Sequence, residues 1–150
     1  RANNTWIAGN QSRTAIQSFF AGGEERNERN EALLVSSDQP DILGGGNTAP
    51  NPGERYLSAV SGCLTSTIVP YASVQGYTIK NINVVSEGRM DARGFFGVLE
   101  DVERGFTHIE IKICITGDIS VESLQNLVSY SPVYEMVSKA ADVKLNIVVI

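Results

Sequence analysis

The sequence predicts an α+β fold built on an antiparallel sheet, and three observations lead to that prediction. In residues 108–115, HIEIKICI, isoleucines alternate with other side chains, as expected of a strand buried on one face. Between about Glu54 and Val69, apolar side chains recur at three- and four-residue steps, which is the helical period. The predicted strands and helices come in blocks, in the order β-β-α-β-β-α-α-β, and this order favours α+β over a wound parallel sheet.

The length and composition indicate one globular domain. A chain of 150 residues with 42% hydrophobic side chains can bury a core without disulfides or metal, so we expect a single domain over residues 1–150. No apolar run approaches the ~18 residues of a membrane span, so we expect no membrane segment. A net charge of −5 without a Lys/Arg stripe argues against nucleic acid as a partner. Two cysteines and no secretory leader pattern favour a cytoplasmic location.

The N-terminal third is expected to contain a hairpin. Residues 1–12 are mostly polar, and either a docked N-terminal arm or a frayed end fits them. Residues 12–20 (SRTAIQSFF) and 31–37 (EALLVSS) are rich in strand-forming side chains. Two such runs around a glycine-containing charged segment predict a hairpin, and Arg26 and Arg29 lie near its tip.

A long loop and a long helix follow. Residues 38–53 hold three Pro and four Gly, and loops of this length tend to be functional. The helix is expected to start near Glu54, whose carboxylate suits the positive end of the helix dipole. Pro70 predicts a kink or an end near Val69, and Gly76 closes the segment. The apolar face of the helix consists of Leu57, Val60, Leu64 and Ile68.

The second half alternates strands and helices. Residues 77–90 and 144–150 are expected to be strands, and residues 91–106 a wide hairpin connection or a packed loop. Residues 108–115 predict a half-buried antiparallel strand. One face of this strand consists of Ile109, Ile111, Ile113 and Ile115, and the other face includes Glu110, Lys112 and Cys114.

Two short helices are predicted before the last strand. Residues 121–130 show a helical apolar spacing, and either Asp118 or Ser120 could cap the first helix. The second helix begins after Ser131 as N-cap, with Pro132 at the first helical position, where its missing N–H costs nothing.

Cys63, within the long helix, is the first candidate for chemistry. A reactive cysteine needs a helix N-terminus, a cation or a base to stabilise its thiolate. Cys63 lies too deep in its own helix for that helix's dipole to help, so a cation would have to come from elsewhere in the fold. A buried structural cysteine is the alternative, because free Cys often behaves as a small hydrophobe. The candidate cations are Arg13, Arg26, Arg29 and Arg55.

The remaining polar residues support other chemistry weakly. Cys114 is either a plain strand cysteine or a redox partner, and the only histidine, His108, lies on the same strand face. A Cys-His hydrolase would need His108 beside Cys63. We expect no metal and no cofactor, because the chain lacks zinc-ligand spacing and the phosphate-binding glycine motifs.

The loop and helix LGGGNTAPNPGERYLSAVSGCLT resemble the OsmC/Ohr family (osmotically inducible protein C-like, organic hydroperoxide resistance). DQP before this segment, then FTHIEIKICI and SPVYEMV, follow in the family's order, so the resemblance covers about residues 30–150. It implies an antiparallel sheet wrapped around a long central helix, in an intertwined homodimer with active sites at the subunit interface.

The resemblance also implies a thiol peroxidase that reduces organic hydroperoxides. In the family, the helix cysteine attacks the peroxide, an arginine from the N-terminal hairpin stabilises the thiolate, a glutamate at the helix start holds the arginine, and a second cysteine resolves the sulfenic acid. By position Cys63 matches the peroxidatic cysteine. Arg29 is preferred to Arg26 as the arginine, because it directly precedes the second strand of the hairpin. Glu54 is the candidate glutamate.

This chain departs from the family's pattern at two places, which suggests a divergent branch. Ser131 stands where the second cysteine is expected, so an external thiol would be needed as reductant. Gly53 stands where the peroxidase branch has its glutamate, and Glu54 comes one position later. On a regular helix Glu54 and Cys63 would face opposite sides, about 13 Å apart along the axis, so either an arginine would have to bridge them or the first turn would have to be irregular.

Two functions of different classes follow from the sequence. The first is a thiol-dependent peroxidase that reduces organic hydroperoxides through Cys63. The alternative is a non-catalytic homodimer that binds a small apolar molecule at the subunit interface, with Cys63 as a packing residue.

Overall fold

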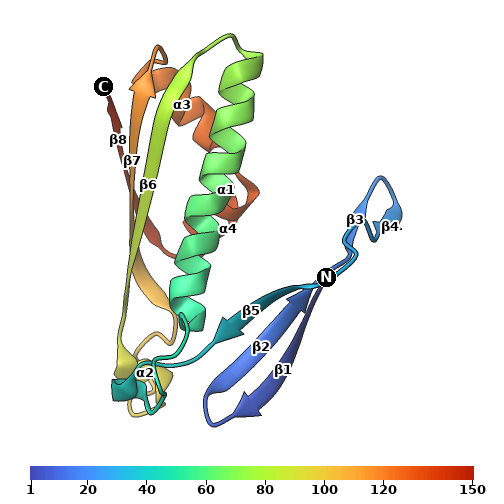
Figure 1. The fold of residues 1–150 in the computed structure, drawn as a ribbon. Coiled ribbons are helices and arrows are strands. Elements are labelled where there is room, and N and C mark those ends of the chain that lie inside the picture. Colours follow the sequence, from blue (N-terminus) through green and yellow to red (C-terminus); the bar gives the residue numbers. More distant parts are fainter. The chain divides into compact units, whose positions relative to one another are not determined.

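The computed structural model describes residues 1–150, and the chain divides into two compact units, Arg1–Arg55 and Tyr56–Ile150. The first unit is built mainly of strands, and the second combines a sheet with helices (Figure 1). The expectation of a single domain over the whole chain stays a prediction.

The first unit contains two small antiparallel sheets. Strands β1, β2 and β5 form one sheet in that order, and β3 pairs with β4 in a short hairpin. The expected hairpin is present as the β2–β5 pair, in which Thr14 lies opposite Val35. The N-terminal residues, for which a docked arm and a frayed end were both open, form a strand paired with β2. The bounds are β1 (Ala2–Ala8), β2 (Gln11–Ile16), β3 (Phe19–Ala21), β4 (Glu24–Arg26), β5 (Leu33–Ser37) and the 3₁₀ helix η1 (Asp41–Leu43).

The buried carboxylate of Asp38 organises the long loop after β5. Its Oδ2 accepts hydrogen bonds from the Thr48 hydroxyl at 2.7 Å, the Thr48 N–H at 3.1 Å and the Gly46 N–H at 3.2 Å. Its Oδ1 accepts from the Gln39 N–H at 2.8 Å. The hydrogen bonds from Thr48, that of its hydroxyl foremost, and from the Gln39 N–H lower the pKa of Asp38 to about 2. The glycine-rich loop therefore folds around one acid.

We predict that Asp38→Asn lowers thermal stability at neutral pH, because an amide cannot accept all of these hydrogen bonds. The pKa of Asp38 in the folded chain is below its ordinary value of 3.8, so its contribution is present above that value and is lost as the pH falls towards about 2. The melting temperatures of wild type and variant should therefore converge between pH 4 and pH 2, measured by circular dichroism. Asp41→Asn, at an exposed neighbouring acid, is the control. A difference in melting temperature that does not change with pH would contradict this role of Asp38.

Helix α1 (Pro52–Val74) begins with a capping box. The Glu54 N–H donates to Asn51 Oδ1 at 3.0 Å, and the Asn51 N–H donates to Glu54 Oε2 at 2.8 Å. Pro52 takes the first helical position, where no N–H is needed. The helix therefore starts two residues earlier than expected, and the Glu54 carboxylate caps it.

Pro70 does not end α1, contrary to one of the two outcomes expected for it. The helix runs on to Val74 as one segment (Figure 1), and Pro70 lies inside these bounds. Ile68 and Ala72, on either side, are fully buried, and their packing offsets the loss of one backbone hydrogen bond. Gly76, at φ +86°, ends the segment as expected, and the Tyr77 N–H donates back to the Ala72 carbonyl at 2.9 Å.

The second unit contains a three-stranded sheet in the order β6-β7-β8. β6 and β7 are antiparallel, but β7 and β8 are parallel, so the expectation of an antiparallel sheet is wrong for this pair. Two helices, α3 and α4, connect β7 to β8, and a crossover of this kind is what a parallel pair requires. The bounds are β6 (Ile79–Met90), α2 (Ala92–Phe95), β7 (Phe106–Gly117), α3 (Val121–Val128), α4 (Pro132–Ala140) and β8 (Asp142–Val149).

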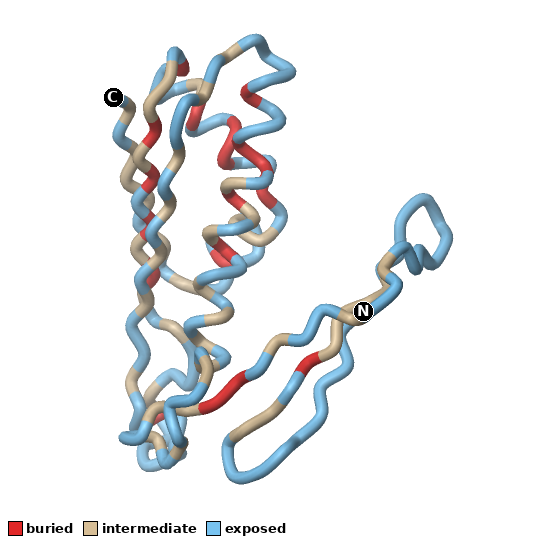
Figure 2. Tube along the Cα trace, viewed as in Figure 1, coloured by how far each residue is buried: buried red, intermediate tan, exposed pale blue.

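The hydrophobic core lies in the second unit, between the sheet and its helices. The alternation predicted for β7 is confirmed, because its four isoleucines are fully buried. Figure 2 shows buried residues along α1 and along β7. The partners of the isoleucines are Val60, Leu64, Ile68 and Ala72 of α1, and Leu124, Leu127, Val128 and Val137 of α3 and α4.

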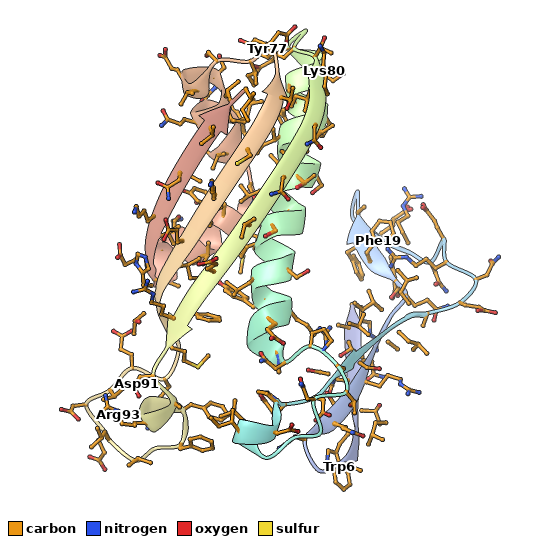
Figure 3. The ribbon with its side chains drawn as sticks, turned by 60° about the vertical axis from the view of Figure 1, so that its left-hand side comes forward. Trp6, Phe19, Tyr77, Lys80, Asp91 and Arg93 are labelled. Carbon is orange, nitrogen blue, oxygen red and sulfur yellow. The ribbon has the colours of Figure 1, made fainter.

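The helix caps of the second unit follow the sequence closely. Ser120, and not Asp118, caps α3, accepting from the Ser123 N–H at 3.0 Å. Asp118 instead accepts from the Thr78 N–H at 2.6 Å. Asp91 caps α2 and pairs with Arg93 at 2.6 Å, and both side chains are labelled in Figure 3.

By length and composition alone, α1 is long and apolar enough to cross a membrane. The expectation that no segment of the chain has the length and apolar character of a membrane span is therefore wrong. Core helices of soluble proteins meet the same threshold. Here α1 packs its Val60, Leu64 and Ile68 face into the core of the second unit.

Candidate functional site

Cys63 and Ser131 meet in the second unit. Cys63 lies in the middle of α1 and is half-buried, whereas Ser131, at the N-cap of α4, is fully buried. The Ser131 hydroxyl donates a hydrogen bond to the Cys63 sulfur, with 3.2 Å between Oγ and Sγ. No other hydrogen bond reaches this sulfur within the chain.

Local sequence explains why a hydroxyl lies at this point. Ser131 and Pro132 start α4 as predicted, and Ser131 Oγ accepts from the Tyr134 N–H at 3.4 Å. Val128 before the cap and Val137 after it are buried in the same core as α1. This packing holds the start of α4 against the middle of α1.

The sulfur therefore lies at the N-cap of a second helix. The N-terminal end of a helix carries positive partial charge and favours a thiolate. Sequence reasoning considered only the dipole of α1, in which Cys63 is too deep, and missed that of α4. The Ser-Pro pair indicated a helix start, but nothing in the sequence indicated which side chain that start would contact.

The two predicted arginines, Arg29 and Arg26, both belong to the first unit. The guanidinium of Arg29 makes more contacts than that of Arg26. Its Nη1 donates to the Gln17 carbonyl at 3.2 Å, and Gln17 Nε2 donates back to the Arg29 carbonyl at 3.2 Å. Its guanidinium lies over the ring of Phe19, 5.9 Å from the centroid, and Phe19 is labelled in Figure 3. Arg26 makes only a 3.9 Å ion pair with Glu24, and its side chain is 48% exposed. Pairing of either arginine with Cys63 stays a prediction.

Glu54 caps α1 through its carboxylate. Its Oε2 accepts a hydrogen bond from the Asn51 N–H. This structural role is not one that the family resemblance implies. Its predicted role of holding an arginine stays a prediction.

Cys114 and His108 do not join Cys63. Both lie on the face of β7 opposite the buried isoleucines, where His108 Nδ1 is 2.8 Å from Asp142 Oδ2 of β8. Cys114 lies opposite Asn83 of β6. The arrangement therefore provides no base for a Cys-His hydrolase.

The second unit also contains a cleft of about 370 Å³ with a mostly apolar lining. The rings of Tyr56 and Phe106 stack there with centroids 6.0 Å apart, and the lining includes one acid, Glu103. Cys63 is not part of this lining.

Comparison with known proteins agrees on one family. The family model described as OsmC-like protein matches residues 44–146, which is more than half of the chain. No curated protein matches the chain significantly.

Solved structures share the fold along nearly its whole length. An OsmC organic hydroperoxide resistance protein from Legionella pneumophila is 20% identical, with a TM-score of 0.67 over 99% of this chain and 96% of that one. An OsmC-like protein from Mycoplasma pneumoniae is 12% identical, with a TM-score of 0.68 over 100% and 97%. An organic hydroperoxide resistance protein from Elizabethkingia anophelis, with thiocyanate bound, is 17% identical, with a TM-score of 0.67 over 100% and 96%. From the family match and the shared fold, we conclude that this chain belongs to the OsmC/Ohr family of OsmC-like proteins.

Proposed function

We propose that this protein is a thiol-dependent peroxidase that reduces organic hydroperoxides through Cys63 and is regenerated by an external thiol. The observation that carries the proposal is the hydrogen bond from the buried Ser131 to the Cys63 sulfur at the start of α4. Two structural relatives described as organic hydroperoxide resistance proteins support the substrate class. The proposal also places the protein in the cytoplasm, where thiols are kept reduced.

The proposed cycle needs only one cysteine of this chain. The Cys63 thiolate attacks the terminal oxygen of ROOH, the O–O bond breaks, and the alkoxide takes up a proton and leaves as ROH. Cys63 is left as a sulfenic acid. A thiol R′SH condenses with it to give a mixed disulfide and water, and a second R′SH releases R′SSR′ and restores the Cys63 thiol. The net reaction is ROOH + 2 R′SH → ROH + R′SSR′ + H₂O.

In this proposal Arg29 supplies the cation for the thiolate. The hydrogen bond to the Gln17 carbonyl and the Phe19 ring hold its guanidinium in one orientation, which reduces the entropy lost on pairing. Arg26 is the less suitable candidate because it is more exposed. Glu54 would orient the arginine, in addition to capping α1.

We also propose that the protein works as an intertwined homodimer with active sites at the interface. All the fully buried hydrophobic side chains of the chain lie in the second unit, and the first unit buries none. Within one chain, only 28% of the apolar stretch of α1 is buried. A second copy that covers these surfaces would supply the missing core, and light scattering of the purified protein tests this. The exposed hydrophobic side chains of the first unit include Trp6, Ile7, Phe20, Leu33 and Leu34.

The peroxidase function is tested by single-turnover oxidation of the wild-type protein with cumene hydroperoxide, followed by trapping of the sulfenic acid with a dione reagent. We expect Cys63 to be labelled and to react much faster than a free thiol. Hydrogen peroxide serves as the comparison oxidant for substrate class. If Cys63 reacts no faster than a free thiol, the peroxidase proposal fails.

Ser131→Cys is predicted to convert the one-cysteine cycle into a two-cysteine cycle. The 3.2 Å contact places a new sulfur beside Cys63, so the sulfenic acid should be captured as an intrachain disulfide. Intact mass spectrometry after one equivalent of cumene hydroperoxide should show the disulfide in the variant and a sulfenic acid in the wild type. Ser120→Cys, at the cap of α3, is the matched control and should form no disulfide with Cys63. A persistent sulfenic acid in Ser131→Cys would contradict the geometry.

The second candidate function, non-catalytic binding of a small apolar molecule, has its own supporting observation in the cleft beside Tyr56 and Phe106. A cleft of about 370 Å³ with an apolar lining suits a small hydrophobic ligand. In that case Cys63 should alkylate no faster than a free thiol, and an apolar fluorescent probe should bind with unchanged affinity to Cys63→Ala.

A further inference from the structure

We propose that Ser131 is a positioning residue for Cys63, whose hydroxyl holds the sulfur as a thiolate through a directed hydrogen bond. This inference rests on the peroxidase function proposed above, and it adds a thiolate-stabilising group that belongs to the same unit as Cys63.

The direction of the hydrogen bonds supports this role. A serine hydroxyl has one proton to donate and can accept hydrogen bonds at its oxygen. At Ser131 the oxygen accepts from the Tyr134 N–H, and the proton is directed at Cys63 Sγ. The two hydrogen bonds form a chain from the first turn of α4 to the sulfur, and such chains polarise their members.

Burial strengthens the effect. Ser131 has no exposed surface, so water does not compete for its hydroxyl. A hydrogen bond to an ionised acceptor is stronger than one to a neutral acceptor, so the bond to Cys63 favours the thiolate over the thiol.

The neighbouring titratable side chains have partners of their own. On α4, Lys139 donates to Glu135 at 2.6 Å, a pair that lowers the pKa of Glu135, and both side chains are more than half exposed. Tyr71 of α1 stacks on Tyr130, beside the start of α4, with ring centroids 5.1 Å apart. The side-chain hydrogen bond that reaches the Cys63 sulfur comes from the Ser131 hydroxyl.

The test compares pH–rate profiles of Cys63 in the full-length protein with Cys114→Ser as background. Two reactions are followed: alkylation by iodoacetamide, and single-turnover oxidation by cumene hydroperoxide. For Ser131→Ala we expect the midpoint of both profiles to move up by about one pH unit, and the rate near pH 7 to fall about tenfold. Ser131→Thr keeps the hydroxyl and should restore the wild-type profile.

Ser120→Ala is the matched control, because Ser120 caps α3 in the same way and does not contact Cys63. It should leave both profiles unchanged. If Ser131→Ala does not fold, Ser131→Thr and Ser131→Val make the same comparison, since they have the same shape and differ by the hydroxyl.

The outcomes separate this inference from the function it rests on. Fast oxidation in the wild type with no shift in Ser131→Ala overturns the role of Ser131 and leaves the peroxidase function standing. A shifted alkylation profile with slow wild-type oxidation supports the role of Ser131 and overturns the peroxidase function. If Ser120→Ala shifts the pH–rate profiles as much as Ser131→Ala does, the role of Ser131 is also overturned, because loss of a helix cap alone would then explain the shift.

Discussion

Cys63→Ser should abolish the reduction of cumene hydroperoxide, lowering the rate constant by about a thousandfold or more. The serine hydroxyl is not ionised at neutral pH and cannot attack the peroxide oxygen as a thiolate does. The change removes one sulfur from a half-buried position, so the fold should survive it. Peroxide consumption in the presence of excess dithiol, with circular dichroism of the same sample, measures the effect.

Cys114→Ser is the control for this experiment. Cys114 lies on the outer face of the sheet, paired across from Asn83 and without contact to Cys63. It should therefore retain the wild-type rate. If Cys114→Ser loses most of the activity while Cys63→Ser retains a rate close to that of the wild type, the peroxidatic cysteine is Cys114 and the assignment to Cys63 is wrong.

Arg29→Ala should lower the rate of Cys63 oxidation by about 10- to 100-fold, the size expected for losing one hydrogen bond or ion pair to a charged group. The loss should appear in the rate constant and as an upward shift of the pH–rate profile, because in the proposed site the guanidinium stabilises the thiolate. Arg29→Lys should recover only part of the rate, since an ammonium lacks the planar guanidinium that lies over Phe19. Stopped-flow single-turnover oxidation at several pH values provides the measurement.

Arg26→Ala is the matched control, with the same charge removed from the same segment. Its side chain has only a long contact to Glu24, and we expect it to change the rate little. A larger effect from Arg26→Ala than from Arg29→Ala would reverse the assignment of the two arginines.

Local patterns in the sequence predicted most of the secondary structure. The alternation in β7 and the apolar face of α1 depend only on the period of strand and helix, and both appear as expected. The start of α1 at Pro52 is also determined locally, because Asn51 and Glu54 have the spacing of a capping box.

Features that depend on packing could not be predicted in the same way. The parallel direction of β8 follows from the path of α3 and α4, and a strand's side-chain pattern is the same in either direction. The passage of α1 through Pro70 depends on the buried neighbours that hold the helix together. The role of Asp38 depends on how the glycine-rich loop returns to its carboxylate.

The candidate site shows the same division. The amino-acid sequence alone established that Cys63 lies within a long helix, that Ser131 caps another helix, and that the chain resembles the OsmC/Ohr family. Only the tertiary structure decided that these two side chains touch, because they are 68 positions apart and meet through the packing of α4 against α1. A cap is determined by a few neighbouring residues, whereas a contact between two helices depends on every side chain in the core between them.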